Sequence, residues 1–588
     1  MRRLQIEWRG TGNALAALRQ ELEQYGHVAG TGSVDLVIED GSQPLPPSPA
    51  SAPWLSLRVG IGPLCEHGLP SLQLRCYDRE RRLLTVHDVA REPSGNGQRL
   101  RQQATNAVVE WAALLVCGFS RDPAYFSATA AANAWPEQGL QELDALAFMH
   151  RFNHTAAPAL LHAARTPMIE RLQASLNTFA HRTVLNIAGH ALTYRQLQQQ
   201  AMAIQQRLLP LLEDAEAPQV VGVCLEKSAE LYASILAVLG CGAVYLPLVP
   251  DHPEQRQHCM LTSLKACVLL ENGQHPLRER FVSLDVSQVA AHSADMTQPL
   301  MRHRPGADEP CVALFTSGTT GQPKGVLLSQ YNLAHFTAWL VSCVALDQHS
   351  RVLQFSPLGF DSSLIDIFPA LIAGAELIVP SPDQRHDPQQ LVELIRKQRV
   401  THGFVPPALL SILPLDQPLG MTHLLTGGDF CEPCVIEQLA GQCQLHNLYG
   451  PTEATVLATH RVFQRGDSHR NIGLPIANSQ VLILDENLQP VDEQVMGDLY
   501  IVGPGVSLGY SNTLSRADNP FVALTLPNGQ VLQAYRSGDL AKWTQEGIEL
   551  GGRRDEQVKI RGFRVQPQDI EQCLRDSRLF RQVAVVID

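Results

Sequence analysis

The chain lacks several features that would place it in common classes of protein. Its basic residues form no long run and its formal net charge is −12, which argues against nucleic acid as the main partner. No apolar signal-peptide core follows Met1, and glycines and prolines interrupt the most apolar stretch, 234–250. The sequence therefore predicts a cytoplasmic protein with no nucleic-acid partner and no membrane partner.

The cysteines also form no obvious pattern. All 13 are scattered, and no histidine pair stands at zinc-finger spacing, so neither a disulfide framework nor a zinc site is expected. Hydrophobic residues make up 45% of the chain and charged residues 18%, which is ordinary for a globular protein. A length of 588 residues is too great for one hydrophobic core, so several domains are expected.

The most informative stretch, 314–330, reads as strand, polar loop and strand. Its glycines let backbone N–H groups approach an anion, its hydroxyls donate hydrogen bonds, and Lys324 adds positive charge, so the loop suits a polyphosphate. A glycine follows Lys324, whereas a Walker A loop has Ser or Thr there. An ordinary polar hairpin is the alternative. The residues assigned to nucleotide binding here are Thr316, Ser317, Gly318, Thr319, Thr320, Gly321 and Lys324.

A second loop, 447–453, places an amide, an aromatic ring, a hydroxyl and a carboxylate close together. Such a set can pair with a base, stack on it, contact a phosphate and bind a divalent cation. Mg²⁺ prefers oxygen ligands of this kind. Seen alone, each part could equally belong to a structural turn.

These loops resemble motifs of the acyl-adenylate-forming enzymes, which include adenylation domains of nonribosomal peptide synthetases, acyl-CoA and aryl-CoA ligases, and luciferases. The further matching segments, in family order, are 192–197, 239–248, 497–510, 535–540 and 552–562. The resemblance implies an α/β fold whose large adenylation core, of αβ-sandwich subdomains plus a distorted β-barrel, covers 151–554. A small α+β C-terminal subdomain would begin at 555 and be truncated at 588.

The resemblance also implies roles for individual residues. Thr452 would contact the α-phosphate, Glu453 would bind Mg²⁺, and both are the candidate catalytic residues. The adenine and ribose would meet Gly427, Gly428, Asp429, Asn447, Tyr449, Asp539 and Arg553. Asp555 would be the hinge about which the small subdomain turns.

Asp361 decides between branches of the family, because peptide synthetase domains use an aspartate here to pair with the substrate's α-ammonium. A buried ammonium costs several kcal/mol unless it meets a carboxylate. Asp361 could also be the N-cap of a helix starting at Ser362. By resemblance the pocket contains Asp361, Ser362, Ile365, Phe404, Leu425, Gly427, Leu448, Val456 and Leu457. Apart from Asp361 these residues are mainly apolar and offer no charge to a polar substrate side chain, so an apolar amino acid is expected. Leucine, isoleucine and valine come first, and phenylalanine or a nonproteinogenic relative second.

The implied reaction is attack of an amino-acid carboxylate on ATP to give an aminoacyl-adenylate and pyrophosphate. The family then transfers the aminoacyl group to the phosphopantetheine thiol of a carrier domain, within a series of synthetase modules. The family's catalytic lysine belongs to a later motif, so weak adenylation is expected from residues 1–588 alone. The alternatives are a CoA or aryl-acid ligase, and a pseudo-enzyme scaffold.

Residues 1–130 are predicted to form a small Rossmann-like α/β domain, and 131–150 a linker. The domain's expected strands are 4–8, 34–38, 55–59, 72–77 and 83–89, and its expected helices are at about 15–25 and 97–117. The segment weakly resembles a shortened formyltransferase. Ser56 and Arg58 stand where that family has its catalytic Asn and His. A guanidinium cannot serve as the general base that histidine provides, so a docking or structural role is expected.

Overall fold

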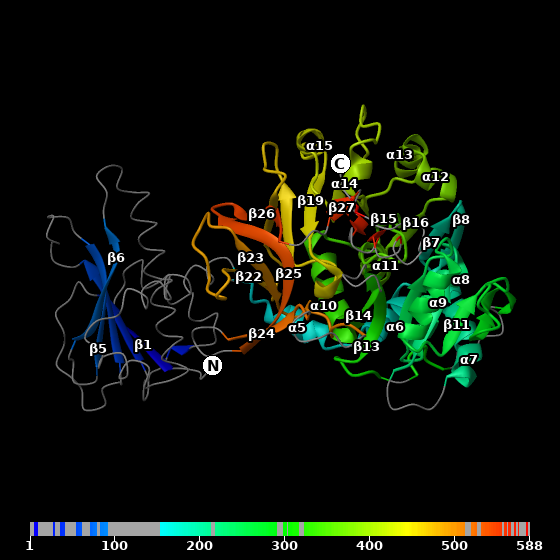
Figure 1. The fold of residues 1–588 in the computed structure, drawn as a ribbon, viewed down its shortest axis with the longest axis horizontal. Helices are drawn as coiled ribbons and strands as arrows, with labels where there is room; N and C mark the ends of the chain where they lie inside the picture. The colour runs from blue at the N-terminus through cyan, green and yellow to red at the C-terminus, as the bar shows by residue number, and fades with distance from the viewer. Residues whose placement is uncertain are drawn as a thin grey trace. The chain divides into compact units, whose positions relative to one another are not determined.

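The protein is described from a computed structural model. Side chains are described for 153, 155–212, 218–290, 298–302, 304–316, 323–511, 519–524, 531–554, 570, 571, 574, 584 and 585. Elsewhere only the backbone of certain strands is described. The chain divides into two compact units, 1–151 with 527–530, and 152–526 with 531–588 (Figure 1).

The first unit contains a six-stranded sheet in the order β2-β1-β3-β4-β5-β6. Its strands are β1 (Gln5–Arg9), β2 (Val28–Ala29), β3 (Leu36–Asp40), β4 (Leu55–Ile61), β5 (Ser71–Asp78) and β6 (Leu83–Arg91). β1 to β4 pair in parallel, and β5 and β6 continue antiparallel. Five of these strands were expected and β2 was not. The helices expected around 15–25 and 97–117 lie outside the described residues.

The second unit begins with a six-stranded sheet in the order β12-β11-β9-β10-β13-β14. Its strands are β9 (Val220–Cys224), β10 (Val244–Leu248), β11 (Val268–Glu271), β12 (Val282–Asp285), β13 (Pro310–Thr316) and β14 (Lys324–Ser329). The central strands are nearly continuous apolar runs, as expected of parallel strands covered on both faces. β13 and β14 form the antiparallel pair predicted to flank the phosphate loop.

A second, 14-stranded sheet has a parallel half and an antiparallel half. The first half contains β7 (Thr183–Ile187), β8 (His190–Thr193), β15 (Arg351–Leu353), β16 (Glu376–Val379), β17 (His402–Phe404), β18 (His423–Gly427) and β19 (Gln444–Tyr449). Apart from the β7–β8 hairpin, these strands pair in parallel in the order β7-β16-β15-β17-β18-β19. Their carboxyl ends therefore meet at one edge, where α/β proteins commonly bind ligands.

The antiparallel half continues from β19 through β20, β21, β26, β25, β23 and β22. These strands are β20 (Thr459–Phe463), β21 (Asn471–Pro475), β22 (Gln480–Leu484), β23 (Gly497–Val502), β25 (Val531–Thr544) and β26 (Gly547–Arg553). β24 (Phe521–Thr525) pairs with β25, and β27 (Val558–Ile560) pairs with β28 (Phe563–Val565) in a separate hairpin.

Helices of the second unit enclose its main hydrophobic core. They are α5 (Pro158–Ala164), α6 (Met168–Thr178), α7 (Tyr194–Leu208), α8 (Ala229–Gly240), α9 (Glu254–Ser263), α10 (Gln330–Cys343), α11 (Ser362–Ala373), α12 (Pro382–His386), α13 (Pro388–Lys397), α14 (Pro407–Leu410) and α15 (Pro433–Leu439). Short 3₁₀ turns are η1 (Leu209–Leu211), η2 (Val286–Gln288) and η4 (Thr452–Ala454). α10 and α11 pack against each other, and reciprocal capping boxes at Thr193 and Ser329 begin α7 and α10.

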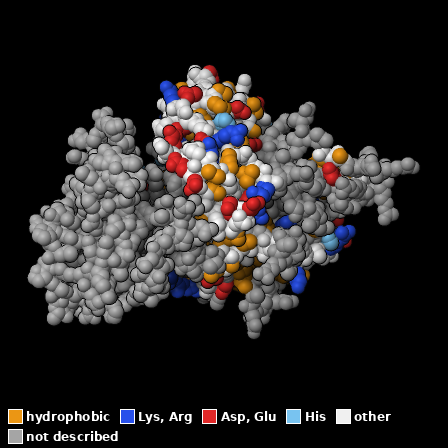
Figure 2. Space-filling view, turned by 60° about the vertical axis from the view of Figure 1, so that its left-hand side comes forward, with side chains coloured by type: hydrophobic (Ala, Val, Ile, Leu, Met, Phe, Trp, Pro, Cys, Tyr) orange, Lys and Arg blue, Asp and Glu red, His pale blue; other side chains and the backbone are white. Residues whose placement is uncertain are grey.

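No helix among the described residues is long and apolar enough to cross a membrane. On the face shown in Figure 2, basic, acidic and apolar side chains of the described residues lie interspersed.

Candidate active site

A cavity of about 470 Å³ opens at the carboxyl edge of the parallel strands. Its wall comes from segments that directly follow or end β15, β17, β18 and β19, so strand order alone brings together residues far apart in sequence. Apolar side chains form most of this wall. The lining residues that sequence reasoning assigned to a substrate pocket are Asp361, Ser362, Ile365, Phe404, Gly427, Leu448 and Val456.

Asp361 and Thr452 connect the cavity wall to the loop that follows β19. The Thr452 hydroxyl donates to Oδ2 of Asp361 at 2.6 Å, although the two residues are 91 positions apart. Asp361 stands at the N-cap position of α11, but its side chain accepts no capping hydrogen bond. The expected capping role is therefore wrong, and the carboxylate lies on the cavity wall instead.

Glycine at position 427 is required by the close approach of β18 and β19. A Cβ atom built there would lie 2.1 Å from the backbone oxygen of Leu448, which is far inside van der Waals contact. The next residue, Gly428, has φ +82°, a left-handed conformation that glycine adopts without strain. Together they let bare backbone form one wall of the cavity.

A positively charged residue that the sequence did not indicate also lines the cavity. Arg385 and His386, at the end of α12, are among its lining residues. The prediction of a pocket without a charged group for a polar side chain is therefore wrong. The segment after β16 carries none of the recognised motifs, so only the fold reveals that it reaches the pocket.

A lysine and an aspartate hold the segment of chain that forms part of the cavity wall. Nζ of Lys227 donates to the carbonyl oxygen of Phe355 at 2.9 Å, and Asp366 accepts from the backbone N–H of Ser356 at 2.8 Å. Burial lowers the pKa of Lys227 and raises the pKa of Asp366, while each charge partly offsets that effect on the other. The pair holds the strand-end segment 355–356, which lines the cavity.

Residues predicted to contact the adenine and the ribose form a connected group. Tyr449 donates to Oδ2 of Asp539 at 2.5 Å, and Nη1 of Arg553 lies 2.6 Å from Oδ1 of the same carboxylate. Burial and the Asp539 carboxylate raise the pKa of Tyr449 well above its ordinary value. The phenol therefore remains a hydrogen-bond donor at neutral pH.

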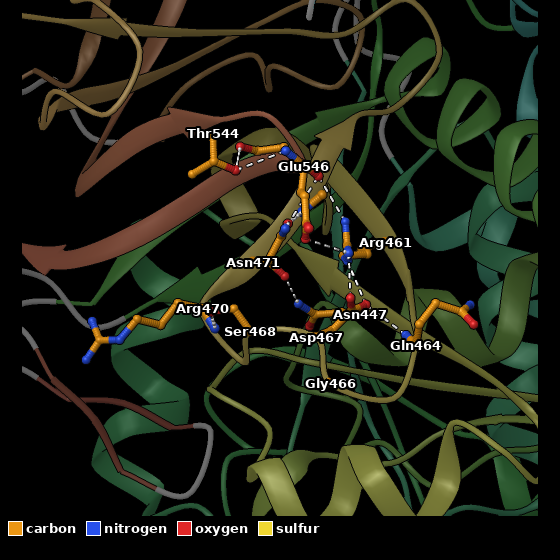
Figure 3. Close-up of polar contacts among 12 residues, drawn as sticks. Asn447, Arg461, Gln464, Gly466, Asp467, Ser468, Arg470, Asn471, Thr544 and Glu546 are labelled. Atoms are coloured by element: carbon orange, nitrogen blue, oxygen red, sulfur yellow. Dashed lines mark hydrogen bonds and ion pairs between the residues drawn. The ribbon is translucent and has the colours of Figure 1, made fainter. Parts of the chain in front are cut away.

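Asn447 is held by a polar network that Figure 3 shows in close-up. Its Nδ2 donates to the backbone oxygen of Asn471 at 3.0 Å. Nearby, Arg461 forms two bonds with Asp467, of 2.9 and 2.6 Å, and also donates to the backbone oxygen of Glu546 at 2.9 Å. These contacts tie β19, β20, β21 and the turn before β26 together and fix the orientation of the Asn447 amide.

Glu453 is fully buried within η4 and accepts a 2.5 Å hydrogen bond from the Tyr510 hydroxyl. Nζ of Lys324 lies 5.4 Å from the centroid of the same Tyr510 ring. The Thr316 hydroxyl is buried and has no hydrogen-bond partner among the described residues. The carboxylate oxygens of Glu453 are ligands of the kind that Mg²⁺ prefers, so this residue fits that ion chemically.

The remaining predicted residues have other positions. Leu425 and Leu457 are buried in the main core and are not among the cavity-lining residues. Asp429 accepts a 2.8 Å bond from the backbone N–H of Phe430. Ser317, Gly318, Thr319, Thr320 and Gly321, and the hinge candidate Asp555, lie outside the described residues.

Comparison with known proteins shows the family to which the chain belongs. The model of the AMP-binding enzyme family matches residues 172–511, more than half of the chain. The chain belongs to the AMP-binding enzyme family. The match spans the cavity and the loops around Lys324, Thr452 and Tyr510.

This AMP-binding enzyme is similar to segments of much longer peptide synthetases. It is 31% identical to bacitracin synthase 3 of Bacillus licheniformis over 76% of the chain and 7% of that protein. It is 35% identical to phosphinothricin tripeptide synthetase PhsB of Streptomyces viridochromogenes, over 69% of the chain and 36% of that protein. The chain thus spans only a minor part of these relatives.

Solved structures show the same fold. A peptide synthetase protein with adenylation and PCP domains matches with a TM-score of 0.64 and 27% identity, over 71% of this chain and 73% of that one. An artificially fused adenylation–PCP di-domain from Klebsiella oxytoca matches with a TM-score of 0.62 and 26% identity, over 71% and 84% of the two chains. The expected α/β adenylation fold is confirmed. These matches do not bear on the formyltransferase interpretation of the first unit.

Proposed function

We propose that this AMP-binding enzyme is an amino-acid adenylation domain of a nonribosomal peptide synthetase. The observation that carries the proposal is the Asp361–Thr452 contact, which places a carboxylate on the wall of an acyl-sized cavity and beside the proposed phosphate loop. A carboxylate there would pair with the α-ammonium of an amino acid, for which a fatty acid has no equivalent. The similarity to peptide synthetases supports the same branch.

In the proposed reaction, a carboxylate oxygen of the amino acid forms a bond to the α-phosphorus of ATP, and the bond to pyrophosphate breaks. No proton transfer is needed, so binding and orientation account for the catalysis. Asp361 would hold the ammonium and Thr452 would contact the α-phosphate. Tyr449 would stack on adenine, Asp539 and Arg553 would bind the ribose, and Lys324 would approach the outer phosphates.

Glu453 is the residue that would bind Mg²⁺, which would neutralise phosphate charge. Tyr510, which donates to Glu453, would orient that carboxylate, and Lys324 would add positive charge on the same side. The buried environment strengthens these electrostatic interactions because the effective dielectric constant there is lower than in water.

The substrate side chain would lie against Ile365, Phe404, Leu448 and Val456, so an apolar amino acid remains the first candidate. Arg385 supports a second candidate, an amino acid whose side chain carries a carboxylate or another strong hydrogen-bond acceptor. The variant Arg385→Leu separates the two. It should leave the affinity for an apolar substrate within about twofold and reduce that for an acidic one roughly tenfold or more.

The proposed partners are a carrier protein domain and neighbouring synthetase modules. The two solved structures described above contain adenylation and PCP domains, which supports a carrier that receives the activated amino acid. The phosphopantetheine thiol would belong to that carrier and not to this chain.

The test measures binding and exchange separately. Calorimetry with non-hydrolysable aminoacyl-adenylate analogues reports recognition, and amino-acid-dependent ATP–pyrophosphate exchange reports the chemical step. Tight binding of at least one aminoacyl analogue, weakened by Asp361→Asn, is expected. If only analogues without an α-ammonium bind, the chain belongs to the acyl-acid or aryl-acid branch and the proposal is wrong.

A further inference from the structure

Four histidines form a continuous row across one face of the large sheet, outside the proposed adenylation site. They come from four adjacent strands, β17 to β20. The rings of His402 and His423 stack at 4.7 Å between centroids, those of His423 and His446 at 5.2 Å, and those of His446 and His460 at 5.1 Å. Such a row of imidazoles is costly to bury and has no part in the proposed reaction.

Hydrogen bonds connect the inner part of the row. Nδ1 of His423 lies 3.0 Å from Nε2 of His446, and Nδ1 of His446 lies 2.8 Å from Nε2 of His460. His446 is 1% exposed, so its ring nitrogens face only protein. Burial of both rings disfavours the charged imidazolium form. Neutral imidazole is the form that binds metal ions.

A thiol lies at the end of this row. Sγ of Cys343, the last residue of α10, is 3.8 Å from Nε2 of His460. One ligand atom each from Cys343, His446 and His460 lie within 4.8 Å of one another. The Trp339 ring packs edge-on to His460, with centroids 5.4 Å apart, and shields this side of the group.

We propose that Cys343, His446 and His460 form a binding site for a borderline-soft transition-metal ion of the Zn²⁺ class. One thiolate and two imidazoles are ligands that select such an ion over Mg²⁺. A water molecule would complete a four-coordinate site, because three protein ligands leave one position open.

The present distances between the ligand atoms are close to those of a tetrahedral zinc site, so metal binding would require only small movements of the side chains. In a tetrahedral zinc site, ligand nitrogens lie about 3.3 Å apart, and a sulfur and a nitrogen about 3.6 Å apart. The nitrogens of His446 and His460 must separate by roughly half an ångström from their present 2.8 Å, while the sulfur–nitrogen distance already fits.

His423 would orient the site. With Nδ1 of His446 bound to the ion, its Nε2–H donates to Nδ1 of His423 at the present 3.0 Å distance. Metal-bound histidines usually have such a partner on the second ring nitrogen, which fixes the tautomer. Binding also displaces the thiol proton of Cys343 to solvent, so the thiolate balances part of the ion's charge.

The test is titration of the chelator-treated full chain with Co²⁺, which reports thiolate ligands by near-ultraviolet charge transfer and tetrahedral geometry by visible absorption. One equivalent should bind with both signatures, and Zn²⁺ should displace it. The charge-transfer band should vanish in Cys343→Ser. It should persist in the control Cys443→Ser, which removes a half-buried thiol outside the group. His423→Phe should weaken binding about 10- to 100-fold.

Absence of stoichiometric binding, or a spectrum unchanged by Cys343→Ser, would overturn the proposal and leave the row as a structural hydrogen-bonded feature. If Cys343→Ser does not fold, X-ray absorption of the zinc-loaded natural chain decides. A zinc ligand set of one sulfur and two imidazole nitrogens would support the proposed site, and any other protein ligand set would contradict it. Calorimetry with the aminoacyl-adenylate analogue is a separate measurement, so failure of either proposal can be recognised independently.

Discussion

The hydroxyl of Thr452 donates a 2.6 Å hydrogen bond to the carboxylate of Asp361. This single contact connects the start of α11 with the loop after β19, and thereby the proposed amino-acid and phosphate subsites. Both residues belong to short motifs, but nothing in the spacing of those motifs along the chain indicates that their side chains touch. The contact makes Asp361 the residue whose substitution is most informative.

Replacement of Asp361 by Asn should weaken binding of an aminoacyl-adenylate analogue by about 3 kcal/mol, roughly 100-fold, because the substrate ammonium loses its carboxylate partner. Calorimetry measures this directly. The control is Asp383→Asn, which removes the same charge from an exposed site on α12. Equal loss of affinity in both variants would show that net charge, and not position, is responsible.

Replacement of Asp539 by Asn should weaken ATP binding more than replacement of Tyr449 by Phe. Asp539 joins both Tyr449 and Arg553, so its loss leaves a buried guanidinium without its carboxylate partner. Loss of the Tyr449 hydroxyl removes one hydrogen bond, worth about 1 kcal/mol. Nucleotide titration of the two variants checks the order, and a reversed order contradicts the proposed ribose role.

Substitution of Gly427 by Ala should both destabilise the protein and impair the cavity. The new methyl group would overlap the Leu448 backbone oxygen, and overpacking of this kind costs about 1–3 kcal/mol. Gly420→Ala is a suitable comparison, because its φ of +81° is strained for alanine while no atom lies within 4 Å of the new Cβ. Urea unfolding measures the loss of stability in each variant. Only Gly427→Ala should also reduce binding of the adenylate analogue.

Acid should destabilise the second unit through its buried histidines. Burial lowers the pKa of His402 and His460 to about 4 and that of His446 to about 3, below the ordinary value near 6.5. Below pH 6.5 the unfolded chain therefore binds more protons than the folded chain, and stability is lost as the pH falls towards 4. Each ring should contribute a loss of about 2 kcal/mol at pH 5.

Urea unfolding at pH 7.5 and pH 5 in the presence of a chelator tests this. His402→Asn should make the stability less dependent on pH, since it removes one buried ring that is not a proposed metal ligand. His349→Asn, at an exposed position, is the control and should leave the pH dependence unchanged. A natural chain equally stable at both pH values would contradict the expectation.

The resemblance of several short motifs to the acyl-adenylate-forming enzymes was sufficient to predict the fold of the second unit, whereas each loop by itself could have been a structural turn. Arg385 could not be placed in the same way, since it reaches the cavity only through the packing of α12 after β16. The three proposed metal ligands likewise come from α10, β19 and β20. Cys343 and His460 are 117 positions apart in the sequence, so their spacing gives no sign that they form a group. The expectation that the cysteines form no pattern was wrong at one place, because Cys431 and Cys434 stand at Cys-x-x-Cys spacing, the first buried and the second exposed.

The hydrogen bond between Tyr449 and Asp539 also shows that the large sheet is strongly curved. Four strand pairings separate β19 from β25, and in a flat sheet those steps would span about 19 Å. A hydrogen bond of 2.5 Å between the two side chains is possible only because the intervening strands β20, β21 and β26 curl strongly. The spacing of base and ribose subsites is thus set by the bend of the sheet, so a substitution in any of these strands that flattens it would separate Tyr449 from Asp539 without touching either residue.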